Sequence, residues 1–257
     1  SMYGFAAQYI KHDFLRKVAS FHPLLIGGNP FDTPSIYGLI IQFEKQWGVH
    51  YCVGGTGAII KALCKLFEEC GGTIKLNAEV KQILIENKKA KGIELKDGSV
   101  HEADEVVCNG DVAFAYKNYI PKRLLPKPMN LWLSNVQYSN SLVVIYFGTK
   151  KKYNDSKLSH HNLILGNDYN KLMRDIFQRK ILPRELGLYL HMPSQTDDTI
   201  APEGCDCFYV LSLVPNLDGK INWNDLMGEY VDKVLGFLEE NYLPELRDNI
   251  IAQHAVT

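Results

Sequence analysis

The stretch WGVHYCVGGTGAIIKALCKLFEECGGTIKLNAEV, residues 47–80, has the order of elements of a nucleotide-binding β-α-β unit. An apolar run leads into glycines, and from Thr56 onward apolar residues recur with the period of an amphipathic helix. Two glycines at 71–72 end the helical pattern, and residues 73–77 have the composition of a second strand. The stretch therefore predicts a strand, a glycine turn, a helix and a strand.

The glycine turn matches a dinucleotide-binding fingerprint only in part. That fingerprint has the form G-x-G-x-x-G/A, and Gly55 and Gly57 fill its first two positions. The third position is Ile60, whose side chain obstructs close packing of helix on strand. A Walker phosphate loop is excluded because no Gly-Lys-Ser/Thr follows. The pattern alone favours a tight turn with close backbone approach over a dinucleotide site.

The remainder of the chain mixes helical and extended patterns. Short strands with turns at ENKK and KDGS are expected between residues 80 and 107. We expect helices at 3–18, 35–47, 111–119 and 224–242, and longer strands at 139–149, 186–192 and 208–214. The mixture predicts an α/β (α+β) fold, in which a mixed β-sheet is flanked by helices.

Composition excludes several functional classes. The formal net charge of −1 gives no field that would favour nucleic acid. No apolar run approaches the roughly 18–20 residues of a membrane-spanning helix. The six cysteines form no CxxC pair, a pattern typical of reduced thiols in a cytosolic protein.

The predicted strands are apolar on both faces. In the first strand, residues 142, 144 and 146 alternate with residues 143, 145 and 147, and the later two strands alternate in the same way. Such a sheet needs a cover on each side. Helices would cover one side, and a helix, a cofactor domain or a ligand would cover the other.

Histidines and lysines offer weaker signals. His160 and His161 suggest a metal pair, but neighbours on an extended segment point to opposite sides, and no third ligand follows at useful spacing. We therefore predict no metal site. The KKKY sequence at residues 150–153 is typical of a solvated turn, with contact to anionic lipid headgroups as the alternative.

Several longer strings carry a family resemblance. They are residues 14–80, DEVVCNGDV (104–112), YSNSLVVIYFG (138–148), residues 186–217 and LEENYLPELR (238–247). Together they resemble bacterial phytoene desaturases, the FAD-dependent carotenoid desaturases, within the wider group of flavin amine oxidases. The similarity spans nearly the whole chain in the same order.

The resemblance implies different functions for different parts of the chain. Residues 1–47 and 112–257 would form a substrate domain, and residues 48–111 a segment of the FAD domain. The substrate would be a hydrophobic polyene such as phytoene, which loses hydrogen by hydride transfer to flavin. We expect Tyr146, His191, Phe208 and Val210 to contact it.

The cofactor contacts implied by the resemblance are few. Val80 would approach the adenine end of FAD through its backbone, and Asn109 and Asp111 of the CNGD turn would lie near the cofactor. The family's N-terminal GxGxxG and its C-terminal glycine-rich stretch are not found here, so we expect a central portion that is inactive alone and binds FAD poorly. No catalytic residue is assigned. The intact enzyme would be cytoplasmic and peripherally membrane-associated.

Two other functions remain open at this point. One is a stand-alone carrier of apolar ligands that lacks redox activity. The other is a small NAD-dependent reductase that uses the turn at Gly55 and Gly57.

Overall fold

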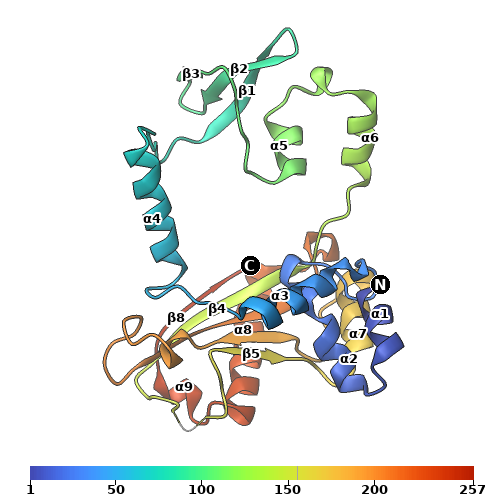
Figure 1. The fold of residues 1–257 in the computed structure, drawn as a ribbon, viewed down its shortest axis with the longest axis vertical. Helices are drawn as coiled ribbons and strands as arrows, with labels where there is room; N and C mark the ends of the chain where they lie inside the picture. The colour runs from blue at the N-terminus through green and yellow to red at the C-terminus, as the bar shows by residue number, and fades with distance from the viewer. Residues whose placement is uncertain (155) are drawn as a thin grey trace. The chain divides into compact units, whose positions relative to one another are not determined.

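A computed structural model describes residues 1–154 and 156–257 (Figure 1). The chain forms two compact units, residues 1–61 with 139–257, and residues 62–138. These units are defined by contacts within the chain, whereas the expected domains 1–47, 48–111 and 112–257 were defined by their expected functions. That functional division remains a prediction, and the α/β (α+β) fold class is confirmed.

The larger unit is built on a five-stranded sheet in the order β5-β6-β7-β4-β8. Every neighbouring pair is antiparallel. The three predicted long strands are confirmed as β4, β6 and β7, whereas the short strand β5 and the edge strand β8 were not predicted. Their bounds are β4 Ser141–Thr149, β5 His161–Ile164, β6 Leu188–His191, β7 Asp206–Val214 and β8 Ile250–Val256.

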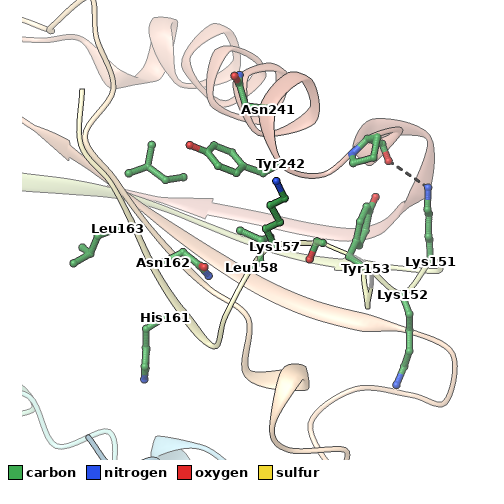
Figure 2. A pocket seen from close by; sticks show the side chains of 13 residues that line it. Lys151, Lys152, Tyr153, Lys157, Leu158, His161, Asn162, Leu163, Asn241 and Tyr242 are labelled. Carbon is green, nitrogen blue, oxygen red and sulfur yellow. Dashed lines mark hydrogen bonds between the residues drawn. The ribbon is translucent and has the colours of Figure 1, made fainter. Parts of the chain in front are cut away.

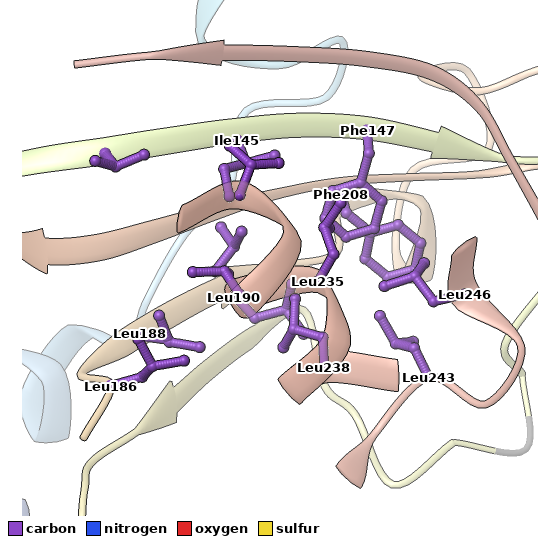
Figure 3. Close-up of a cluster of buried hydrophobic side chains, with 14 of the residues drawn as sticks. Ile145, Phe147, Leu186, Leu188, Leu190, Phe208, Leu235, Leu238, Leu243 and Leu246 are labelled. Carbon is purple, nitrogen blue, oxygen red and sulfur yellow. The ribbon is translucent and has the colours of Figure 1, made fainter. Parts of the chain in front are cut away.

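One face of this sheet packs on helix α8 (Trp223–Asn241), as Figure 3 shows. Alternate residues of β7 are buried because successive side chains point to opposite faces. Ser212 of β7 and Tyr230 of α8 share a buried hydrogen bond of 2.7 Å between their hydroxyl groups. The helix buries one apolar side, namely Tyr230, Val231, Val234, Leu235 and Leu238. The short helix α9 (Leu246–Asn249) completes this core with Leu246.

The N-terminal segment contains short helices rather than one long one. The helix expected over 3–18 is two helices, because Ile10 adopts an extended conformation between them. The helix expected over 35–47 is confirmed as a 3₁₀ turn followed by an α-helix. The elements are α1 Met2–Tyr9, α2 Asp13–Ser20, η1 His22–Ile26, η2 Ser35–Gly38 and α3 Leu39–Trp47. Residues of this segment pack on α7 (Tyr169–Arg174), which continues into η4 (Asp175–Arg179).

The smaller unit contains a three-stranded antiparallel meander. Its strands are β1 Val80–Glu86, β2 Lys89–Leu95 and β3 Val100–Glu102. Asn87 and Lys88 take positive φ in the first turn and Gly98 does so in the second, so both predicted turns are confirmed. The unit also contains α5 Val112–Asn118, η3 Lys122–Leu124 and α6 Lys127–Asn135.

The predicted β-α-β unit is only partly formed. Helix α4 (Thr56–Glu69) is confirmed, but neither residues 47–53 nor residues 73–77 form a strand. A strand requires a hydrogen-bonded neighbour, and within the described ranges no strand pairs with either segment. The apolar stripe of α4 is correspondingly exposed, with Ile60 at 60% and Leu63 at 57%.

Candidate functional site

An apolar cavity of about 470 Å³ lies between the second face of the five-stranded sheet and the N-terminal segment. From the sheet side its lining includes Leu163, Leu211 and Leu213. From the N-terminal segment, Phe21 and Leu24 face them. The cavity therefore has an apolar surface of the kind that binds a ligand by shape and apolar contact.

Strand register explains why these leucines share one face. Leu163 of β5 lies opposite Tyr189 of β6, and Tyr189 lies opposite Leu211 of β7. One row of side chains thus crosses three strands on the side away from α8. The alternation of the strands predicts this face, but pairing across the sheet is needed to align its members.

Two of the expected substrate contacts lie on this same face. Tyr146, Tyr209 and His191 form a second row, in which Tyr146 pairs with Tyr209 and Tyr209 with His191. The ring centroids are 5.8 Å and 4.4 Å apart in these two pairs. Tyr146 is 47% exposed and His191 only 7%. Their contact with substrate remains a prediction.

The other two expected contacts lie on the opposite face. Phe208 and Val210 are 3% and 0% exposed and belong to the core under α8. The Phe208 ring stacks on Phe147 with centroids 4.9 Å apart. The prediction combined residues of both faces, because alternation does not tell which apolar face is covered by a helix. A ligand in the cavity cannot contact Phe208 or Val210 without opening this core.

The glycine turn contacts a carboxylate. The Gly54 amide donates a hydrogen bond of 2.7 Å to Oδ2 of Asp197, a side chain that is 4% exposed. Hydrogen bonds from Thr199 and from the Gly54 amide hold the pKa of the Asp197 carboxyl below its usual range. Gly54 and Gly55 have φ of +83° and +78°, so the prediction of a tight turn is confirmed.

The residues around this turn do not fit a diphosphate. An ionised carboxylate already accepts from the Gly54 amide, and it would repel a phosphate placed there. Nothing in the sequence pattern singles out Asp197. No local pattern links it to Gly54, from which it is 143 positions distant.

Three histidines meet on the face that carries the cavity. One ring nitrogen each of His160, His161 and His191 lies within 4.8 Å of the others. The geometric premise behind the prediction of no metal site was wrong, because His160 occupies a bend before β5 rather than an extended segment. The third histidine is supplied by β6, where His191 pairs with His161.

Burial keeps this histidine cluster neutral. It lowers the pKa of His160 and His161, and burial together with the two neighbouring imidazoles lowers the pKa of His191 to about 4. Neutral imidazoles keep a lone pair on one ring nitrogen. The cluster can therefore donate lone pairs to a metal ion at neutral pH.

A second cavity, of about 860 Å³, lies beside the edge strand β5 (Figure 2). Its lining includes Lys151 and Lys152 of the KKKY sequence together with Lys157. Lys151 forms a 2.7 Å ion pair with Glu245. His161 borders this cavity as well as the apolar one. Basic and apolar surfaces therefore meet at β5.

The expected cofactor contacts lie in the smaller unit. Val80 is half-buried at the start of β1, where it pairs with Leu95. Asn109 and Asp111 are exposed, and Asp111 caps helix α5 by accepting a 2.7 Å hydrogen bond from the Phe114 amide. Nothing in these positions tests whether the three residues bind the cofactor, so that role remains a prediction.

Comparisons with known proteins place the chain in a family. The model of the flavin containing amine oxidoreductase family matches residues 3–179. A lycopene-forming phytoene desaturase from Pseudescherichia vulneris is 38% identical over 258 residues, covering 100% of this chain and 52% of that protein. A neurosporene-forming phytoene desaturase from Rhodobacter capsulatus is 41% identical over 263 residues, covering 100% of this chain and 50% of that protein.

A solved structure supports the fold. An oxidoreductase from Methanosarcina mazei aligns with a TM-score of 0.72 at 23% identity, over 99% of this chain and 55% of that one. The chain thus spans about half the length of the curated relatives it matches. On the strength of the matched family model, the chain belongs to the flavin containing amine oxidoreductase family.

Proposed function

We propose that this chain is the mainly substrate-binding part of an FAD-dependent oxidoreductase that desaturates a carotenoid precursor such as phytoene. The observation that carries the proposal is the apolar cavity on the second face of the sheet. The match to phytoene desaturases along the whole chain supports the choice of a polyene.

A hydrocarbon substrate explains the character of the cavity. It has no polar group for orientation, so binding must come from apolar area, at about 25 cal/mol per Å² removed from water. Leucines from β5 and β7 supply such area. Flavin in the intact enzyme would accept the hydride, while residues of this chain hold the polyene and exclude water from it.

The proposal is tested by polyene binding to the 257-residue chain. Leu163 lines the cavity and is 43% exposed, so Leu163→Arg places a charge in the cavity without entering the core. We expect at least tenfold weaker binding of phytoene presented in detergent micelles. Leu217→Arg is the matched control, because Leu217 is 82% exposed and does not line the cavity. Equal affinities of the two variants would contradict the proposal.

FAD binding depends on more than this chain offers. Val80, Asn109 and Asp111 are proposed to lie near the cofactor, and the exposed stripe of α4 to pack against the rest of the flavin domain. The turn at Gly54 supplies no phosphate site because of Asp197. We therefore expect the purified chain to carry no stoichiometric flavin. Flavin absorbance at one equivalent per chain would overturn this expectation.

The cavity would serve a second function equally well. A carrier of polyenes without redox activity needs the same apolar surface, and the cavity itself favours both functions. The flanking reading frame separates them, since a strand, a GxGxxG turn and a helix upstream would support the desaturase. A nicotinamide reductase built on Gly55 and Gly57 is disfavoured by the carboxylate at the turn.

Membrane contact is the remaining part of the proposal. No helix in the described ranges is both long and apolar enough to cross a bilayer. Lysines at the second cavity would instead contact anionic headgroups, at about 1 kcal/mol per residue. Lys152→Glu with Lys157→Glu should reduce cosedimentation with phosphatidylglycerol vesicles, and Lys171→Glu should not. If the protein binds equally to phosphatidylcholine and phosphatidylglycerol vesicles, a role for charge is contradicted.

A further inference from the structure

We propose that His160, His161 and His191 form a binding site for a divalent transition-metal ion of the Zn²⁺ class. The inference goes beyond the proposed function and does not depend on it. Three imidazoles with ring nitrogens within 4.8 Å of one another supply the donor set. This donor set suits Zn²⁺, Cu²⁺ and Ni²⁺ rather than Ca²⁺ or Mg²⁺, which prefer oxygen.

The backbone fixes the positions of the three donors. His161 and His191 are paired residues on adjacent antiparallel strands, so their side chains point to the same face. The bend at His160 brings its ring to within 4.3 Å of the His161 ring, measured between centroids. Zn–N bonds of about 2.0–2.1 Å require nitrogens roughly 3.4 Å apart in a tetrahedral site. Metal binding therefore requires the nitrogens, which lie up to 4.8 Å apart, to move closer by rotation of the rings.

Hydrogen bonds outside the cluster orient two of the rings. Nδ1 of His160 lies 2.6 Å from the Thr196 hydroxyl, and Nδ1 of His161 lies 2.6 Å from the Tyr189 hydroxyl. With Nδ1–H donating to these oxygens, Nε2 of each ring keeps its lone pair for a metal. Histidine ligands in metalloproteins are held by second-shell bonds of this kind.

The polar groups at the centre of the cluster are incompletely paired. His191 is 7% exposed, and its buried Nδ1 has no hydrogen-bond partner. Nε2 of the same ring lies 2.6 Å from Nε2 of His160, a contact that a shared metal ion would replace. The Tyr51 hydroxyl is also buried without a partner, and its ring lies 4.5 Å from that of His160 between centroids. The short contact between the two Nε2 atoms, rather than the unpaired Nδ1, marks the position of a shared ion, because an ion at Nε2 leaves Nδ1 of the same ring without a partner.

The ion would remain open to solvent on one side. His161 is exposed and His160 half-buried, whereas His191 lies underneath them. Three protein ligands leave a fourth position for water or another small ligand, as in catalytic rather than structural zinc sites. His161 borders both cavities, so that position would lie beside the proposed polyene surface.

Metal titration of the tag-free chain tests the proposal. Zn²⁺ competed against a chelating dye should bind at one equivalent per chain, and Co²⁺ should give the visible absorption of a four- or five-coordinate ion. We expect His161→Gln to weaken binding at least 100-fold. Because His161 is exposed, this variant should fold normally, as circular dichroism would verify.

Two further variants distinguish a metal-binding site from a histidine cluster that only forms hydrogen bonds. Thr196→Val removes the partner of His160 and should weaken Zn²⁺ binding about tenfold. His254→Gln is the matched control, since His254 is exposed on β8 and lies outside the cluster. Absence of stoichiometric binding, or equal affinity in His161→Gln and His254→Gln, would overturn the proposal and leave a histidine hydrogen-bond cluster only.

Discussion

The two faces of the five-stranded sheet have similar apolar content but opposite surroundings. Val143, Ile145 and Phe208 face α8 and are at most 3% exposed. On the other side, Tyr146 is 47% exposed and Leu163 is 43% exposed, beside a cavity. The comparison shows that apolar strands serve two purposes here. One face stabilises the fold, and the other is available to a ligand.

The largest effect is expected from the face that packs on α8. Phe208→Ala removes a ring that stacks on Phe147 in the core, and it should lower the free energy of unfolding by about 3–5 kcal/mol. Urea denaturation measures the change. The neighbouring substitution Tyr209→Ala, on the other face, should cost clearly less. Equal losses would remove the distinction between the faces.

A smaller loss is expected where sheet and helix share a hydrogen bond. Tyr230→Phe leaves the buried Ser212 hydroxyl unpaired, which should cost about 1–3 kcal/mol. Tyr242→Phe, just beyond the end of the same helix, is the matched control because Tyr242 is only half-buried. If both variants unfold at the same urea concentration as the parent protein, the bond contributes nothing measurable.

The next prediction separates stability from binding. Leu211→Ala, on the cavity face, should cost about 1 kcal/mol of stability or less but weaken polyene binding several-fold. Val210→Ala, its neighbour in the core, should destabilise the fold and leave the affinity of the folded protein unchanged. Thermal unfolding and polyene titration on the same samples provide both readings. Weaker polyene binding by Val210→Ala and unchanged binding by Leu211→Ala would place the ligand on the face that packs on α8, and would contradict the account.

The smallest effect concerns alkaline pH. Burial, assisted by Glu245 and two further carboxylates, raises the pKa of Tyr153 to about 12. The unfolded chain releases this proton near pH 10, so stability should fall as the pH rises from about 10 towards 12. Tyr153→Phe should reduce the loss at pH 11 by less than about 1 kcal/mol. Urea midpoints at pH 8 and pH 11 measure it, and identical losses in both proteins would contradict the assignment.

Much of the fold was predictable from local pattern. Alternation along residues 139–149 and 208–214 predicted strands, and helical periodicity predicted both α4 and α8. Glycine and asparagine marked the hairpin turns. These features depend on residues that are close together in the sequence, so the local pattern is sufficient to predict them.

The features that were missed depend on pairing between distant segments. The short strand β5 aligns His161 with His191, 30 positions further along. Asp197 reaches the amide of Gly54 across 143 positions. Residues 73–77 have strand composition but no partner within the described ranges. Phe208 was grouped with residues of the cavity face for the same reason, since only packing shows which face α8 covers.

Methyl NMR of the leucine- and valine-labelled chain, titrated with phytoene in micelles, tests the central claim most directly. The account predicts shifts for Leu163, Leu211 and Leu213 on the cavity face, and none for Leu190, Val210 and Leu235 in the core between the sheet and α8. Shifts of the methyl groups under α8 with an unchanged cavity face would contradict it.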